Sequence, residues 1–206
     1  MTSNNIPARI AVFLSGGGTG LQAFIDAVKR GDLAADITLV VSSTNKAYGL
    51  ERARHANIDT FVYRPNKYAT EEEAAGDLLA RLAKHKVEFL ALSGYLKLLP
   101  SAVVKAYSGR ITNIHPALLP AYGGKGMYGR HVHEAVIAAG ETESGATVHL
   151  VDEIYDHGRI LEQARVPVLK EDTVDTLSRR VLAEEHKLYP AVLDKLIRGE
   201  YELTND

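Results

Sequence analysis

Residues 9–30, RIAVFLSGGGTGLQAFIDAVKR, decide the fold. Residues 9–14 are a short apolar run of the kind that forms a buried strand, and the glycine-rich residues 15–20 follow at once. From residue 21 onward, large apolar side chains recur at helical spacing. The stretch therefore predicts a strand, a loop and a helix, which is the opening unit of an α/β fold.

The alternation of strand and helix patterns continues through the first half of the chain. The next elements are expected in the order strand, helix, strand, helix, strand, at 37–41, 49–56, 60–63, about 70–84 and 89–93. Strands that alternate with helices are joined by right-handed crossovers and form a largely parallel sheet with helices on both faces. We therefore expect a doubly wound, mostly parallel, Rossmann-like α/β fold.

The pattern changes after Pro100. The β-rich segments 146–151 and 160–168 are joined by a short polar connection, which suits an antiparallel pair at the C-terminal edge of the sheet. A chain of 206 residues is short for two independent domains, so we expect a single domain over residues 1–206. The remaining expected elements are a short helix after Pro100, a strand at 111–114, a loop at 120–129, and helices at about 132–139 and 174–197.

Composition and charge exclude several classes of function. The 24 basic and 26 acidic residues nearly cancel, so the chain lacks the overall positive field that holds nucleic acid or anionic lipid. The absence of cysteine excludes disulfides, cysteine nucleophiles and thiolate zinc sites. No stretch has the pattern of a signal peptide or the length of a membrane span. These features predict a cytoplasmic protein whose partners include neither nucleic acid nor membrane.

The glycine cluster at residues 15–20 is a candidate phosphate site. It lies where the first strand of a parallel sheet meets a helix N-terminus, so bare backbone amides and the helix dipole point at one small volume. Ser15 and Thr19 offer additional hydroxyl donors. The dinucleotide fingerprint needs a glycine where Leu21 stands, and the Gly-Lys-Ser/Thr of a P-loop is absent. A tight turn without a ligand is the alternative interpretation.

Three polar residues form a candidate catalytic group. Asn113 and His115 stand two residues apart at the end of a predicted strand, so strand alternation directs both to one side. Asp156 lies in the connection between the last two strands, where Gly158 allows a sharp loop to aim the carboxylate inward. On spacing alone, a histidine near a strand end is more often a hydrogen-bonded structural residue, and an aspartate close to a glycine is more often a turn former.

These residue types suit acyl transfer to an amine. In that reaction a tetrahedral oxyanion develops, and protons pass from the attacking amine to the leaving nitrogen. Asn113 would donate a hydrogen bond to the oxyanion. His115, protonated beside Asp156, would stabilise the same oxygen and act as general acid, and Asp156 would raise the pKa of the histidine. No metal and no covalent enzyme intermediate is required.

Longer motifs around these residues carry a family resemblance. Residues 113–120, NIHPALLP, and residues 152–158, DEIYDHG, resemble the signature of the phosphoribosylglycinamide formyltransferases, also called GAR transformylases, within the folate-dependent formyltransferases. The resemblance extends from about residue 9 to residue 198. Further matching segments lie at 14–22, 49–53, 93–99 and 185–190.

The resemblance implies an enzyme that moves the formyl group of 10-formyltetrahydrofolate, a co-substrate, onto the amine of 5'-phosphoribosylglycinamide (GAR) in de novo purine biosynthesis. It implies that the products are formyl-GAR and tetrahydrofolate. Transfer is expected to be direct, through a tetrahedral intermediate and without a metal. These small molecules are the expected partners, and the chain is expected to be a monomer or a homodimer.

The resemblance also assigns residues to each part of the reaction. The catalytic roles fall on Asn113, His115 and Asp156. The residues implied to bind the phosphate and the rest of the ribonucleotide are Gly18, Thr19, Gly20 and Glu185. Those implied to line the folate pocket, largely through backbone groups, are Leu96, Lys97, Leu98, Leu99 and Asn113.

Several positions depart from the family pattern. Gly17 and Gly20 stand where relatives commonly carry asparagine, and Lys97 replaces a frequent arginine. Glu71 stands near a basic folate contact of some relatives. The loop Gly123–Arg130 is longer than in the shorter family members, and it is interpreted either as a mobile flap near the substrate or as an inert surface loop.

Other functions remain open from the sequence. Formyltetrahydrofolate deformylases share the catalytic pattern and pass the formyl group to water, but they carry an N-terminal regulatory domain, and here about eight residues precede the first strand. Methionyl-tRNA formyltransferases add a C-terminal RNA-binding domain. A non-catalytic phosphate- or nucleotide-binding protein accounts for the glycine loop only. His131 and His133 suggest a metal site, but no third ligand is positioned, so none is expected.

Overall fold

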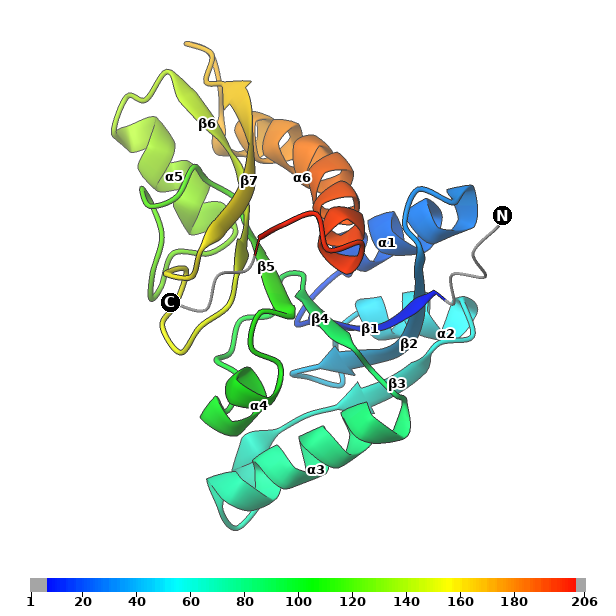
Figure 1. The fold of residues 1–206 in the computed structure, drawn as a ribbon. Coiled ribbons are helices and arrows are strands. Elements are labelled where there is room, and N and C mark those ends of the chain that lie inside the picture. Colours follow the sequence, from blue (N-terminus) through cyan, green and yellow to red (C-terminus); the bar gives the residue numbers. More distant parts are fainter. Residues whose placement is uncertain (1–6, 203–206) are drawn as a thin grey trace.

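The computed structural model describes residues 7–202, which form a seven-stranded sheet between layers of helices (Figure 1). The strands are β1 Ala8–Leu14, β2 Ala35–Ser42, β3 Asp59–Val62, β4 Phe89–Leu92, β5 Ile111–His115, β6 Glu143–Leu150 and β7 Ile160–Pro167. Their order across the sheet is β3-β2-β1-β4-β5-β6-β7. The first five in this order are parallel, whereas β6 runs antiparallel to β5 and β7 antiparallel to β6. The mixed sheet with an antiparallel C-terminal edge confirms the expected fold class.

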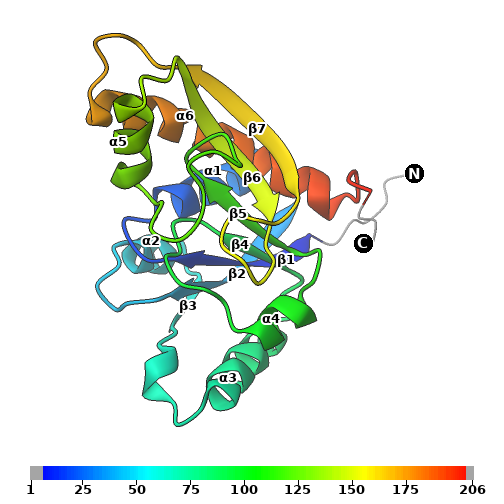
Figure 2. The ribbon, with the colours of Figure 1, turned by 90° about the vertical axis from the view of Figure 1, so that its left-hand side faces the viewer.

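Helices cover both faces of the sheet (Figure 2). They are α1 Thr19–Arg30, α2 Gly49–His55, α3 Glu71–Lys84, α4 Ser101–Ala106, α5 Arg130–Ala138 and α6 Val174–Ile197, with a 3-10 turn at Pro65–Lys67. One hydrophobic core lies between the sheet and α1, α2 and α6, and a second lies on the opposite face under α3 and α4. A third cluster joins α5 to α6 and β6.

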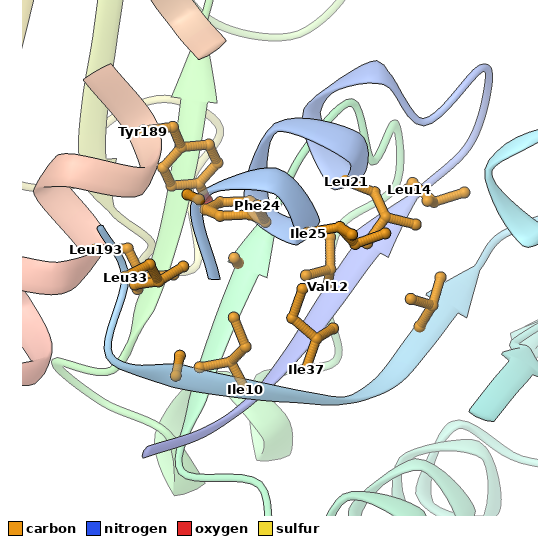
Figure 3. Close-up of a cluster of buried hydrophobic side chains, with 14 of the residues drawn as sticks. Ile10, Val12, Leu14, Leu21, Phe24, Ile25, Leu33, Ile37, Tyr189 and Leu193 are labelled. Atoms are coloured by element: carbon orange, nitrogen blue, oxygen red, sulfur yellow. The ribbon is translucent and has the colours of Figure 1, made fainter. Parts of the chain in front are cut away.

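The central strand β1 supplies side chains to both main cores. Val12 and Leu14 join the core under α1 and α6, and Phe13 joins the core under α3. Phe24 of α1 and Tyr189 of α6 meet edge to face above the sheet, with ring centroids 4.8 Å apart (Figure 3). Burial of each such side chain stabilises the fold by about 1.5–3 kcal/mol. Because both faces of β1 are covered, its sequence is a continuous apolar run instead of an alternating one.

Several element boundaries differ from those expected by one to three residues, and two of these differences have a clear physical reason. Helix α1 begins at Thr19, two residues early, because Gly18 adopts a left-handed conformation with φ 71° and turns the chain directly into the helix. Strand β6 begins at Glu143, three residues early, because its first residues pair with the end of β7 as far as Pro167. The start of β6 lacks the apolar signal from which a strand is recognised.

The strand order creates a crevice at one edge of the sheet. β2 and β3 lie to one side of β1, while β4 and β5 lie to the other, so the crossovers diverge at the carboxyl ends of β1 and β4. Ligands of doubly wound folds bind at such a switch point. Asn113 and His115, at the carboxyl end of β5, lie next to it. Among residues 7–202, no helix combines the length and the apolar character needed to cross a membrane.

Candidate active site

The carboxyl-end edge of the sheet opens into a cavity of about 550 Å³, within the range that holds small organic ligands. Its walls come from segments far apart in the sequence, and Glu185 of α6 also borders it. The main segments are residues 16–20, 92–99, 113–116, 124–129 and 154–156. Every residue to which the family resemblance assigns a catalytic or substrate-binding role therefore borders one cavity.

The glycine loop between β1 and α1 borders the cavity, and its geometry requires glycine at position 18. At Gly18, an added Cβ would lie 2.5 Å from the Cα of Gly49 in α2, and the positive φ is itself unfavourable for other residues. At Gly20, an added Cβ would lie 2.0 Å from the Ser93 hydroxyl, which ends a rotatable side chain. Asparagine at position 20, the common residue of the family pattern, therefore requires the Ser93 hydroxyl to turn away.

Ser15 does not serve the cavity as the sequence suggested. Its hydroxyl oxygen accepts hydrogen bonds from the Leu96 backbone N–H at 3.1 Å and from the Ser43 hydroxyl at 2.7 Å. Ser15 is also absent from the cavity wall, whereas Thr19 borders it. The expectation of a ligand-binding hydroxyl at Ser15 is therefore wrong. Its hydroxyl instead links the carboxyl ends of β1, β2 and β4.

Asp156 points inward because the backbone of the β6–β7 connection is tightly constrained. Asp156 itself has a positive φ of 54°, which few non-glycine residues adopt and which aspartate tolerates better than most. At Gly158, an added Cβ would lie 1.9 Å from the Leu150 carbonyl oxygen, so only glycine allows this turn. The carboxylate accepts a hydrogen bond from the Gly124 N–H at 2.9 Å. The side chain is only 10% exposed.

His115 lies against Asp156, but its protonation differs from the expectation. Its Nε2–H donates to the Tyr122 carbonyl oxygen at 2.7 Å, so Nδ1 is the basic nitrogen, and Nδ1 lies 3.5 Å from Asp156 Oδ2. Burial lowers the pKa of His115 below its ordinary value, and the Asp156 carboxylate opposes this shift without overcoming it. Asp156 thus raises the pKa of His115 as expected, but the expectation of a protonated His115 is wrong, because burial keeps the resting imidazole neutral at neutral pH.

The pKa of Asp156 is set by two opposing effects, its burial and its contacts with neighbouring groups. Burial raises the pKa of this carboxyl, but contacts with His149, His115 and the Gly124 N–H together hold it below the ordinary value. Asp156 is therefore a carboxylate at neutral pH. A buried carboxylate beside a neutral imidazole is ready to stabilise a proton that reaches Nδ1 of His115.

A second histidine, His149, belongs to this cluster and was missed in the sequence. It lies directly opposite Asn113 in the pairing of β5 with β6. Its Nδ1–H donates to the Leu150 carbonyl oxygen at 2.7 Å, so in the neutral ring Nε2 is the acceptor, 3.1 Å from Asn113 Nδ2. The antiparallel pairing of β6 with β5 was the available signal, but the sequence does not reveal its register.

Asn113 is held from two sides by this network. Its Nδ2 lies 3.3 Å from Asp156 Oδ1 as well as 3.1 Å from His149 Nε2, so both amide hydrogens face protein acceptors. Donation to a substrate oxygen therefore requires one of these bonds to be exchanged on binding. The network fixes the orientation of the amide before a ligand arrives.

Glu185 and residues 96–99 form other parts of the wall. Burial raises the pKa of the Glu185 carboxyl to about 7, so this group titrates near neutral pH. Leu96 and Leu98 are about half exposed, whereas Leu99 is buried, which gives this segment an apolar surface on the cavity. Lys97 borders the cavity too, but Glu71, at the start of α3, does not.

The loop Gly123–Arg130 is part of the site. Residues 124–129 border the cavity, and the backbone at the start of the loop contacts the catalytic candidates: Tyr122 accepts from His115 and Gly124 donates to Asp156. Gly123 packs closely here, because an added Cβ would lie 2.6 Å from a Leu119 methyl carbon. These contacts contradict the interpretation of the loop as an inert surface segment.

Comparisons with known proteins agree with this site. The sequence model of the family described as Formyl transferase matches residues 8–193. The chain belongs to the formyl transferase family. The phosphoribosylglycinamide formyltransferase of Haemophilus influenzae is 39% identical over 96% of this chain and 91% of its own length. The chloroplastic phosphoribosylglycinamide formyltransferase of Vigna unguiculata is 46% identical over 91% of this chain, which spans 60% of that longer protein.

Solved structures match the fold of this chain over nearly its whole length. Glycinamide ribonucleotide transformylase 1 from Symbiobacterium toebii matches with a TM-score of 0.91 at 36% identity, covering 100% of this chain and 94% of that one. A formyltetrahydrofolate deformylase from Pseudomonas syringae matches with a TM-score of 0.84 at 21% identity, covering 96% and 64%. The second likeness shows that the formyl transferase fold also occurs in a hydrolase, and at that identity it shows the fold alone.

His131 and His133, at the start of α5, have different surroundings. His131 is exposed, and its Nδ1 lies 3.4 Å from Glu134. His133 is buried, borders the cavity and has a pKa lowered first by burial and then by nearby His115. Within residues 7–202, no three His, Cys, Asp or Glu side chains are grouped as metal ligands.

Proposed function

We propose that the chain transfers the formyl group of 10-formyltetrahydrofolate to the amine of GAR, as a step of de novo purine biosynthesis, within one catalytic domain. The observation that carries the proposal is a single cavity that joins a glycine loop suited to phosphate with the Asn113, His115 and Asp156 cluster. The relatives named phosphoribosylglycinamide formyltransferase support the same substrate pair. The joined cavity brings an amine on a phosphorylated substrate to the catalytic cluster.

The ribonucleotide occupies the end of the cavity near α1 and α6. Its phosphate accepts hydrogen bonds from the backbone amides of Gly18, Thr19 and Gly20, where the α1 dipole adds favourable potential. Glu185 contacts the ribose. Because its pKa is close to 7, the carboxyl is part-protonated at neutral pH, and it both donates to and accepts from hydroxyl groups.

The formyl donor occupies the end of the cavity near β4. The apolar side chains of Leu96, Leu98 and Leu99, with the aliphatic stem of Lys97, cover the pterin ring, and backbone groups of this segment read the ring edge. The formyl carbon then lies next to Asn113. A folate-type donor fits this wall because a flat heterocycle needs apolar cover and a few polar contacts at its edge.

The catalytic cluster acts when the amine attacks the formyl carbon. The Asn113 amide exchanges a protein acceptor for the developing oxyanion and stabilises its charge. The proton leaving the amine is taken up at Nδ1 of neutral His115, where the Asp156 carboxylate stabilises the imidazolium. The same proton then passes to the departing folate nitrogen. His115 is thus base first and acid second, with no metal involved.

The experiment that tests this function is an absorbance assay of 10-formyltetrahydrofolate, or of its 5,8-dideaza analogue, with and without GAR. The proposal requires conversion that depends strictly on GAR and yields formyl-GAR. Equal conversion without GAR, with release of formate, identifies a deformylase. Binding of both ligands with no conversion identifies a non-catalytic binding protein.

A further inference from the structure

The glycine loop has no charged side chain of its own, although its proposed ligand is a phosphate dianion. Its support comes from α2, which lies behind the loop. The Gly49 N–H donates to the Gly16 carbonyl oxygen at 3.1 Å, and Arg52 Nε–H donates to the Gly17 carbonyl oxygen at 2.9 Å. The Cα of Gly49 is also the atom that an added Cβ at Gly18 would meet. Helix α2 and the loop are therefore in direct backbone contact.

These two hydrogen bonds determine where the loop amides point. In a planar trans peptide unit, C=O and N–H point in opposite directions. With the carbonyls of Gly16 and Gly17 directed to α2, the N–H groups of Gly17 and Gly18 are directed away from it. Thr19 and Gly20 add the free N–H groups of the first helical turn. None of these four N–H groups has a backbone acceptor within residues 7–202, and together they form an anion-binding concavity.

Arg52 contributes charge as well as geometry. Its Nη1 donates to Gln22 Oε1 at 3.2 Å, and its guanidinium lies 5.2 Å from the centroid of the Tyr48 ring. In the described part of the chain no carboxylate is in ion-pair distance of Arg52, whereas its neighbour Arg54 pairs with Glu51 on the same helix. The Arg52 charge is therefore not neutralised by the protein, and it lies directly behind the loop.

We propose that Arg52 is a positioning residue of the phosphate site, an inference that rests on the proposed function. It acts through the loop: its Nε–H fixes the Gly17 carbonyl, which aims the Gly18 amide at the phosphate, and its charge attracts the dianion from behind. The planar guanidinium holds the carbonyl and Gln22 at once, which an ammonium group cannot reproduce in the same geometry. Arg52 thereby supplies the positive charge that the loop itself lacks.

The test compares Arg52→Met and Arg52→Lys with Arg54→Met, a matched change on the same helix that leaves the loop contacts intact. For each variant, both substrate KM values, kcat, the thermal midpoint and the Ki of inorganic phosphate against GAR are measured. In Arg52→Met, the GAR KM and the phosphate Ki rise together by about 10- to 100-fold, the range for loss of a charge-assisted hydrogen bond. The folate KM and kcat stay near those of the unmodified protein, and Arg52→Lys recovers less than half of the loss.

Two results would overturn the inference. One is an unchanged GAR KM and phosphate Ki in Arg52→Met. The other is a parallel rise in both substrate KM values with a lowered thermal midpoint, which would show general structural support. Calorimetric titration with inorganic phosphate tests the loop without any reaction. Absence of GAR-dependent turnover in the unmodified protein would therefore defeat the proposed function and still leave the Arg52 comparison decisive.

Discussion

The two ends of the cavity are built in different ways. The proposed phosphate end is one continuous stretch, residues 16–20, which offers backbone amides and in which Gly18 has no room for a side chain. The catalytic end collects Asn113, His149 and Asp156 from two strands and a connection, and it works only through side chains. The first depends on backbone conformation and the second on a hydrogen-bonded network. Damage to the loop should therefore raise the KM for GAR, and damage to the network should lower kcat.

The largest expected effect is in the catalytic network. Asn113→Ala, His115→Ala and Asp156→Asn should each lower kcat by about 10²- to 10⁴-fold, because oxyanion stabilisation or proton transfer is lost. Steady-state kinetics with both substrates, together with circular dichroism to verify folding, measure this. His131→Gln is the matched control, since His131 is exposed and lies outside the cavity wall. Near-normal turnover in any two of the three variants would rule out the mechanism.

The next largest effect should come from the phosphate loop. Gly18→Ala forces a side chain into a left-handed conformation and against the Gly49 backbone, which should destabilise the protein by about 2–3 kcal/mol. The GAR KM should rise at least about tenfold, the equivalent of 1.4 kcal/mol, while kcat at saturating GAR falls much less. Chemical denaturation and kinetics test both parts. Gly76→Ala, in α3 with open space at its Cβ, is the control and should lose no stability.

Other results for Gly18→Ala would contradict the proposed contrast between the two ends of the cavity. If Gly18→Ala lowered kcat and left the GAR KM unchanged, the loop would belong to the catalytic end. A loss of stability without any kinetic effect would support the bare-turn interpretation of the glycine cluster, in which residues 15–20 bind no ligand.

The same contrast explains how much the sequence could predict. Local patterns sufficed for the fold class and for the position of the glycine loop between β1 and α1, because a buried strand, a glycine cluster and a helical spacing are contiguous. The motif around Asn113, His115 and Asp156 was recognisable by family resemblance, and the structure gathers these residues in one cavity. Their catalytic roles remain predictions. Element boundaries failed where polar residues begin a strand, as at Glu143.

What the sequence could not predict are properties that arise from distant contacts. His149 enters the network only through the register of β6 on β5. The pKa of His115 depends on a balance between burial and Asp156, and the sequence reveals the partner but not the burial. Ser15 was predicted to serve the ligand, but its hydroxyl is occupied by Ser43 and Leu96, which approach from neighbouring strand ends.

The smallest predicted effect concerns Glu185 of α6, at the proposed ribonucleotide end of the cavity. Its carboxyl pKa is raised to about 7 by burial, from 4.5 in the unfolded chain. A carboxyl with a raised pKa contributes stability below the unfolded value, and this contribution is lost as the pH rises through about 7. Glu185→Gln removes the titration while keeping the shape of the side chain.

Glu185→Gln should therefore leave stability almost unchanged near pH 4, below the unfolded pKa of 4.5, and increase it at pH 8 by about 1–2 kcal/mol, less than the full value of the shift because solvent reaches part of this side chain. Urea denaturation of the free protein at both pH values measures the difference. The change should weaken GAR binding at the same time, since an amide replaces the proposed ribose contact, with little effect on the folate KM. A stabilised variant with unaltered GAR binding would show a strained buried carboxyl that touches no substrate. If the substitution had the same effect on stability at both pH values, the Glu185 carboxyl would be ionised in the folded protein without penalty. Solvent would then reach the α6 wall more freely than the folded structure indicates.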